Sequence, residues 1–354
     1  MMSSTCARRR VALHCSRMSR VARHSPEHDL PVSPSPVPVP AHLGAAFRVR
    51  DARAAGLTRT RLAAHDLRRP LWGVRTTADF TGSDSAEATV DDFGLRRVLE
   101  YVPRLAPGAF FVLHSAALLQ GLPVPLFGDT PIHVGVFPPH RAPRGEGVKG
   151  HQVHRHLVAL RTTDGLPTTS PASTWAQLGA VLSVRDLVAV GDAIVRVPRV
   201  EGGTPGHPAS ALGTVAQLEA AIAAGRRVGI NRLREALPLI RAGSSSRPES
   251  HLRLDLLERN LPTPVLDFEV RDGQGRLLGI SELAFPRFRV VVEYEGDHHR
   301  VDKLQWNRDI EKYRAYAAAG WAVVRITAAN LYGDAPSAAA LVRDALWAAG
   351  WRPA

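Results

Sequence analysis

The sequence predicts an α/β protein in three parts behind a basic, proline-rich tail. Its 354 residues correspond to two or three domains at about 150 residues per domain. Stretches with helical periodicity alternate with short apolar runs bounded by turn-forming residues, which is typical of mixed α/β chains. The polar segment Ser244-Ser-Ser-Arg-Pro248 marks a boundary after which the residue pattern changes. We therefore expect a tail at 1–43, followed by parts at 44–89, 90–246 and 247–354.

Composition excludes several classes of protein. The hydrophobic fraction is 45% and the charged fraction 22%, both ordinary for a soluble chain. Because no run of 18 or more apolar residues occurs, we expect no membrane span and a cytoplasmic location. The two cysteines, Cys6 and Cys15, are too few for a disulfide scaffold or a cysteine-ligated zinc site.

The net charge of +12 is concentrated near the N-terminus. Residues 1–43 contribute +4 and residues 44–78 contribute +6, whereas residues 247–354 are neutral. The tail combines six arginines with the proline-rich segment Pro31–Pro40, so we expect it to be disordered and assign it no function. A basic segment favours a polyanion such as nucleic acid. An arginine-rich composition inherited from a high-GC genome is the alternative.

Residues 44–89 have the pattern of a winged helix-turn-helix. An apolar stripe ends at Gly56, Thr58 can cap a second helix over Arg59–Leu67, and Leu71–Val74 alternates like the strand of a wing. Base contacts are usually made from the start of the second helix, where Arg59 and Arg61 fall. The candidate DNA-binding residues are Arg59, Arg61, Arg68 and Arg69. A solvated basic face on a small helical domain is the alternative.

The middle part is expected to be α/β and carries little chemistry. The expected elements are strands at 110–113 and 132–136, helices at 115–120 and 183–195, and a helical bridge over 211–241. His151, His154 and His156 form an H-x2-H-x-H motif, which has the composition of a metal site. The alternative is that they are exposed residues on a strand.

The residue pattern of the C-terminal part predicts helices and strands in the order αβββαβα. Helices are expected at 248–259, 303–319 and 337–348, and strands at 265–271, 276–283, 288–295 and 322–326. A hairpin turn, Asp272-Gly-Gln-Gly275, joins the first two strands.

Carboxylates gather on the third of these strands. Glu293 and Glu295 are two residues apart and point to one face, and Glu282 on the adjacent strand can join them. Three neighbouring carboxylates are a natural site for a hard cation such as Mg²⁺ or Mn²⁺. A histidine just after the strand can take a proton from an attacking water. The alternative is an exposed sheet face whose glutamates pair with arginines.

A family resemblance rests on the segment ELAFPRFRVVVEYEGDHHRVDKLQWNRDIEKYRAYAAAGWAVVRIT. It resembles the very-short-patch-repair-endonuclease-like family of the PD-(D/E)xK superfamily over about 248–330. The resemblance implies an αβββαβ restriction-endonuclease-like domain that cleaves phosphodiester bonds with Mg²⁺. It also implies catalytic roles for Glu249, Glu293, Glu295 and His299, with Glu282 standing where the family usually has Asp. The superfamily's final lysine is absent because Glu295 occupies its position, and His299 is the expected substitute.

A second resemblance concerns residues 44 to about 200. The segments R-D-A-R-A-A-G-L-T-R-T-R-L, V-L-H-S-A-A-L-L-Q-G-L-P and T-S-P-A-S-T-W resemble abortive-infection type IV antitoxins (AbiEi-like). We therefore expect a metal-dependent DNA endonuclease targeted by a winged helix. The alternative is a non-enzymatic DNA-binding regulator of a type IV toxin–antitoxin system, with a toxin as its partner. Oligomeric state does not follow from the sequence.

Overall fold

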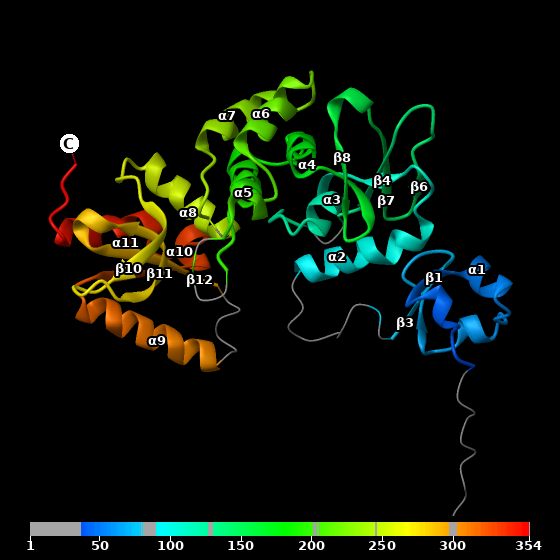
Figure 1. Ribbon diagram of the computed structural model, residues 1–354, viewed down its shortest axis with the longest axis horizontal. Coiled ribbons are helices and arrows are strands. Elements are labelled where there is room, and N and C mark those ends of the chain that lie inside the picture. The colour runs from blue at the N-terminus through cyan, green and yellow to red at the C-terminus, as the bar shows by residue number, and fades with distance from the viewer. Residues whose placement is uncertain are drawn as a thin grey trace, which may run out of the picture. The chain divides into compact units, whose positions relative to one another are not determined.

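The structure is a computed structural model (Figure 1). It describes residues 37–78, 80, 90–126, 130–200, 204, 206–244, 246–296 and 303–353. These residues form a mixed α/β chain with sheets of three, four and six strands. Most of the expected tail lies outside the described residues. Within the described ranges, no helix has both the length and the apolar character needed to cross a bilayer.

The N-terminal part is a small antiparallel sheet with one short helix. Its strand order is β1-β3-β2, and residues such as Phe47, Leu62 and Val74 form its buried core. The elements are β1 (Ala46–Arg48), α1 (Val49–Ala54), β2 (Leu67–Arg68) and β3 (Val74–Thr77). The expected wing strand begins at the last residue of the predicted segment, and Leu71–Gly73 form the turn before it.

The helix predicted over Arg59–Leu67 is wrong. Thr58 does accept a hydrogen bond from the Arg61 backbone N–H (3.1 Å), but only one 3₁₀ turn, Arg61–Ala63, follows. Arg75 Nε donates to the Leu62 carbonyl (2.7 Å) and Arg69 Nη2 to the Ala63 carbonyl (3.2 Å). Because arginine side chains occupy the carbonyls that a further helical turn would use, the chain leaves the helix there.

The middle part contains the six-stranded sheet, in the order β6-β7-β5-β4-β9-β8. Its strands are β4 (Phe110–Phe111), β5 (Ile132–Val136), β6 (Arg144–Gly145), β7 (Val148–Gln152), β8 (Leu160–Thr163) and β9 (Leu166–Thr169). Its helices are α2 (Val90–Tyr101), α3 (Leu113–Leu119), α4 (Pro171–Leu178), α5 (Val184–Val195), α6 (Val215–Ala223) and α7 (Ile230–Ala236). The predicted strand at 132–136 is confirmed. The predicted helix at 183–195 is also confirmed, with Ser183 accepting a hydrogen bond from the Asp186 N–H (3.1 Å).

The H-x2-H-x-H motif does not form a metal centre. No three His, Cys, Asp or Glu residues are arranged to hold a metal ion in the part of the chain that the structure describes. His154 and His156 are exposed beyond the end of β7. His151 lies on β7, where its Nε2 is 2.9 Å from Nδ1 of the buried His133. His154 and His156 are therefore exposed, as the alternative interpretation expected, but they lie beyond the strand and not on it.

The C-terminal part has the predicted order αβββαβα with one short helix added. It comprises α8 (Arg247–Glu258), β10 (Val265–Arg271), β11 (Leu277–Phe285), β12 (Val290–Glu295), α9 (Lys303–Ala318), β13 (Ala322–Thr327), α10 (Ala328–Tyr332) and α11 (Ala338–Ala348). The strands run β10-β11-β12-β13 across the sheet, and β12 and β13 are parallel.

Helices cover both faces of this four-stranded sheet (Figure 1). Leucines of α8 and apolar residues of α11 pack with Val290 and Val292 on one face. Tyr316 of α9 packs with Val291 on the other face. Side chains alternate along β12, so Glu293 and Glu295 belong to the face that α9 covers.

Helix α8 is anchored on α5 by a buried ion pair. Arg253 Nη2 lies 2.9 Å from Asp192 Oδ2, and both side chains are almost fully buried. Asp192 also accepts hydrogen bonds from the Ser250 hydroxyl (2.8 Å) and the Arg241 backbone N–H (2.6 Å). These donors compensate the carboxylate for the water it has lost.

Replacing Asp192 with Ala is expected to destabilise the protein strongly, because Arg253 stays buried without its counter-charge. We expect the free energy of unfolding in urea to fall by about 3–5 kcal/mol. The matched control is Arg259→Ala, which breaks the exposed pair with Asp255 (3.2 Å) and is expected to cost under about 1 kcal/mol. Equal losses in the two variants would show that the buried pair is not a major anchor.

Acid is expected to destabilise the middle part through its neutral histidines. Burial, and then the charges of His151, His114 and Lys149, lower the pKa of His133 from 6.5 to about 3. The unfolded chain therefore binds more protons, and stability is lost as the pH falls through that window. In His133→Phe the free energy of unfolding is expected to depend less steeply on pH below about 6.5. The slope falls by up to one bound proton, which is about 1.4 kcal/mol per pH unit. Urea unfolding at several pH values measures it. The exposed His65, replaced by Gln, is the control, and parallel curves for His133→Phe and wild type would refute the idea.

Candidate active site

Two strands bring the carboxylates of Glu282 and Glu293 together. β11 and β12 are antiparallel, with Leu283 opposite Val292, so Glu282 and Glu293 are the next residues along the two strands. Glu282 Oε2 accepts a hydrogen bond from the Tyr294 backbone N–H (2.8 Å). This bond holds the Glu282 side chain against β12.

Glu249 joins this pair from helix α8. The Ser246 hydroxyl caps the helix by accepting the Glu249 backbone N–H (3.3 Å), which places Glu249 in the first turn. Its side chain is buried. Its charge is the second cause, after burial, that raises the pKa of Glu282, and the charge of Glu293 is the third. We call Glu249, Glu282 and Glu293 the carboxylate cluster.

The cluster is electrostatically costly when all three groups are ionised. Burial and the two neighbouring carboxylates raise the pKa of Glu282 to about 9. Burial also raises the pKa of Glu293, which is only 5% exposed. Carboxylates this close and this dry require protons or a cation.

Lys312 of α9 supplies one cation. Its Nζ lies 3.0 Å from Glu293 Oε1, and its charge opposes the rise in the pKa of both Glu293 and Glu282. Sequence reasoning missed this residue because it looked for a lysine at the strand position that Glu295 occupies. A usable signal was present, since Lys312 is one of only three lysines in the chain and lies one helical turn after Asp309.

Glu295 lies near Glu293 and has hydrogen-bond donors of its own. Arg325 Nε of β13 donates to its Oε1 (2.7 Å), and the Tyr313 hydroxyl donates to the same oxygen (3.1 Å). The alternative of a glutamate paired with arginine on the sheet therefore describes Glu295. It does not describe the buried Glu293. Glu249 is a further carboxylate near Glu282, and the charge of Glu295 also contributes to the raised pKa of Glu293.

The donor set suits a magnesium ion only in part. Among the described residues no three carboxylates or histidines are arranged as ligands of one metal ion. Mg²⁺ usually keeps several waters and takes only one or two protein carboxylates. Glu282 and Glu293 can supply these two carboxylates. Both have a raised pKa, and a bound cation would lower it by stabilising the ionised forms. His299, the expected proton acceptor, lies outside the described residues.

The four predicted DNA-binding arginines differ in their exposure to solvent. Arg61 is buried and binds both carboxylate oxygens of Asp66 (2.9 and 2.8 Å), so it is occupied within the protein. Arg59, Arg68 and Arg69 are exposed. Arg61 therefore contributes to the fold of this segment, because it closes the loop that follows the 3₁₀ turn.

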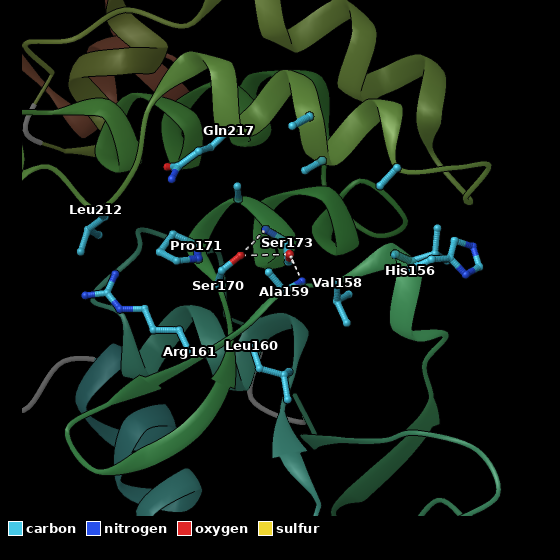
Figure 2. Close-up of a pocket in the computed structure, with 15 residues that line it drawn as sticks. His156, Val158, Ala159, Leu160, Arg161, Ser170, Pro171, Ser173, Leu212 and Gln217 are labelled. Atoms are coloured by element: carbon cyan, nitrogen blue, oxygen red, sulfur yellow. Dashed lines mark hydrogen bonds between the residues drawn. The ribbon is translucent and has the colours of Figure 1, made fainter.

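A pocket of about 620 Å³ in the middle part offers less chemistry (Figure 2). It lies between residues 156–161, the start of α4 and helix α6, and no carboxylate lines it. Its two serines already have structural partners. The Ser170 hydroxyl donates to Ser173 Oγ (3.0 Å), which also accepts the Ala159 backbone N–H (2.9 Å). The carboxylate cluster remains the stronger candidate for catalysis.

Comparisons with known proteins give relatives without an assigned function. The chain is 27% identical over 226 residues to two uncharacterized proteins of Mycobacterium tuberculosis, MT2308 and Rv2248. The matched region covers 63% of this chain and 78% of each relative. No family model matches the chain.

The cluster is expected to bind a divalent cation. Mn²⁺ is expected to raise the unfolding temperature of the wild type, because it binds the folded state and relieves the repulsion there. Glu282→Gln and Glu293→Gln are expected to lose this shift. Without metal, Glu293→Gln is expected to unfold at a lower temperature than the wild type, because it leaves Lys312 without its counter-charge. The exposed Glu311→Gln is the control. Equal Mn²⁺ shifts in all four proteins, measured by differential scanning fluorimetry, would exclude the cluster as the metal site.

Proposed function

We propose that the protein is a metal-dependent DNA endonuclease whose active site is the carboxylate cluster. The observation that carries the proposal is a lysine ammonium 3.0 Å from a buried glutamate, beside a second carboxylate whose pKa is raised to about 9. Buried ionisable groups with opposed charges and shifted pKa values are typical of catalytic sites. The resemblance of residues 248–330 to the very-short-patch-repair-endonuclease-like family supports the same chemistry.

Each residue of the cluster has a role in this proposal. Glu282 and Glu293 would hold the metal ion, and Glu249 would orient the attacking water from α8. Lys312 would stabilise the negative charge that grows on the phosphate during cleavage. The Arg325–Glu295 pair would hold the end of β12 in place. His299 would accept the proton of the attacking water.

A bound Mg²⁺ would polarise the phosphate and help to ionise a water molecule. Glu282 and Glu293 lie on neighbouring strands, so the sheet itself would set the distance between the two ligands. Rigid elements hold catalytic groups more precisely than loops do.

The N-terminal part would bring this site to DNA. Its elements follow the order strand, helix, 3₁₀ turn and two strands, which supports a reduced winged helix-turn-helix. Exposed arginines at 59, 68 and 69 would contact phosphates.

The proposal predicts a nicking activity that depends on the cluster. With Mg²⁺ or Mn²⁺ the wild type is expected to nick supercoiled plasmid, and Glu293→Gln and Lys312→Met are expected to lower the rate by about 100-fold or more. Glu311→Gln, on the exposed side of α9, is expected to keep the wild-type rate. Agarose gels of plasmid over time measure this. The same rate in wild type and Glu293→Gln would exclude the cluster as the catalytic site.

The second candidate is a DNA-binding regulator of the antitoxin type. The observation that favours it is that no three carboxylates or histidines among the described residues are arranged to hold one metal ion, while Lys312 already neutralises Glu293. This candidate requires binding to its own promoter DNA without any nicking. Promoter binding that is unchanged in Glu293→Gln, together with no metal-dependent cleavage, would favour it over the endonuclease.

A further inference from the structure

Six arginines line one hollow, five of them in the N-terminal part and one, Arg104, in the middle part. The hollow has a volume of about 790 Å³ and lies beside the turn Leu71-Trp72-Gly73. No acidic residue is among those that line it. The arginines are Arg48, Arg50, Arg53, Arg69, Arg75 and Arg104. We call them, with Trp72, the arginine–tryptophan pocket.

Backbone contacts hold part of this pocket in place. Arg48 Nε donates to the Pro103 carbonyl, and Arg75 Nε donates to the Leu62 carbonyl (2.7 Å). Arg104 Nη1 donates to the Trp72 carbonyl (3.4 Å), which joins η3 (Val102–Arg104) to the turn. Arg50 and Arg53 project from α1 and are exposed. The pocket therefore combines arginines that are bound to backbone carbonyls with arginines that are exposed to solvent.

The positive charge in the pocket is crowded. Burial and the charge of Arg69 lower the pKa of Arg75. No carboxylate is among the lining residues. Asp66 is bound by Arg61, and Asp51 pairs with Arg50 (3.1 Å), so one of the six arginines has an exposed counter-charge. Because like charges at short range repel, the arrangement favours an anion as the missing partner.

Trp72 gives the pocket an apolar surface at its edge. The residue is 89% exposed, and the turn that carries it is fixed by a hydrogen bond from the Val49 N–H to the Gly73 carbonyl (2.8 Å). Gly73 has a φ of 75°, which glycine adopts without strain. A large aromatic ring held in solvent among guanidinium groups is the combination that stacks on nucleic-acid bases.

We propose that the arginine–tryptophan pocket binds single-stranded DNA, with phosphates on the arginines and an unpaired base stacked on Trp72. Duplex reading through the major groove needs an inserted helix or ribbon. In the described part of residues 37–80, the only α-helix has six residues, and the second helix is reduced to a 3₁₀ turn whose Arg61 is bound by Asp66. The antiparallel pair β2–β3 is too short for a reading ribbon, because β2 has only two residues. This inference rests on different residues from the carboxylate cluster and does not require nuclease activity.

Fluorescence anisotropy of the full chain in EDTA tests the proposal, because no metal-dependent cleavage occurs there. The probes are a labelled single-stranded oligonucleotide without secondary structure and the duplex of the same sequence. We expect the single strand to bind more tightly. Trp72→Ala is expected to weaken its binding by about 5- to 100-fold, whereas Trp72→Phe keeps most of the affinity. Arg50→Gln with Arg53→Gln is expected to reduce the salt slope by about 0.7 for each phosphate that an arginine no longer neutralises.

The exposed Arg343→Gln of α11 is the matched control for the removal of a charge and is expected to bind like the wild type. Wild-type affinity in Trp72→Ala would overturn the proposal. Tighter binding of the duplex, independent of Trp72, would overturn it as well. Urea unfolding of each variant separates a folding defect from a binding defect. If Trp72→Ala is unstable, the variant with Arg50→Gln and Arg53→Gln keeps the test decisive, because an unchanged salt slope in it would also overturn the proposal. Loss of nicking in Glu293→Gln, measured separately, concerns only the proposed endonuclease.

Discussion

The ion pair between Asp192 and Arg253 is the constraint on which the arrangement of the C-terminal site depends. Its two side chains are 0% and 3% exposed, so the attraction acts with little screening. Burial alone raises the pKa of Asp192, and Arg253, Ser250 and the Arg241 N–H oppose that rise. Ser250 and Arg253 both belong to α8 and Asp192 belongs to α5, so these bonds fix where α8 packs on α5.

Helix α8 transmits that constraint to the carboxylate cluster. Leu254 packs in the core of the middle part, whereas Leu252 and Leu256 pack in the core of the C-terminal sheet. Glu249 lies in the first turn of the same helix, one turn before Arg253. A second set of contacts near this end, Asp186 with Arg247 (2.6 Å) and His251 (3.3 Å), reinforces the contact with α5. The helix that both cores share thus also positions one of the three clustered carboxylates.

The protein separates its charges by depth as well as by position. Its positive charge is placed near the surface around Trp72, where an external anion can reach it. The carboxylate cluster lies in a neutral third of the chain, largely buried between a sheet and helices, with one internal cation. The net charge of +12 predicts only the first of these sites, because it sums over groups whose environments differ.

Local patterns alone predicted the elements correctly where the pattern was dense. Helix α5 and its Ser183 cap, the strand Ile132–Val136, and the order of the C-terminal elements all followed from periodicity and capping. The second N-terminal helix did not follow, because Arg69 and Arg75, from outside the segment, occupy its carbonyls. The alternation of side chains along a strand correctly placed Glu293 and Glu295 on one face. It did not predict which cation each glutamate meets.

The sequence by itself determined the mixed α/β class, the placement of Glu293 and Glu295 on one face of a strand, and the basic character of the N-terminal part. These depend on residue type and on spacing along one strand or helix, which the chain carries locally. Tertiary structure decided which cation meets which carboxylate. Lys312 reaches Glu293 from α9, Arg325 takes Glu295 from β13, and Asp66 takes Arg61. A salt bridge depends on distances of a few ångströms between separate elements, and only the packed structure sets those distances.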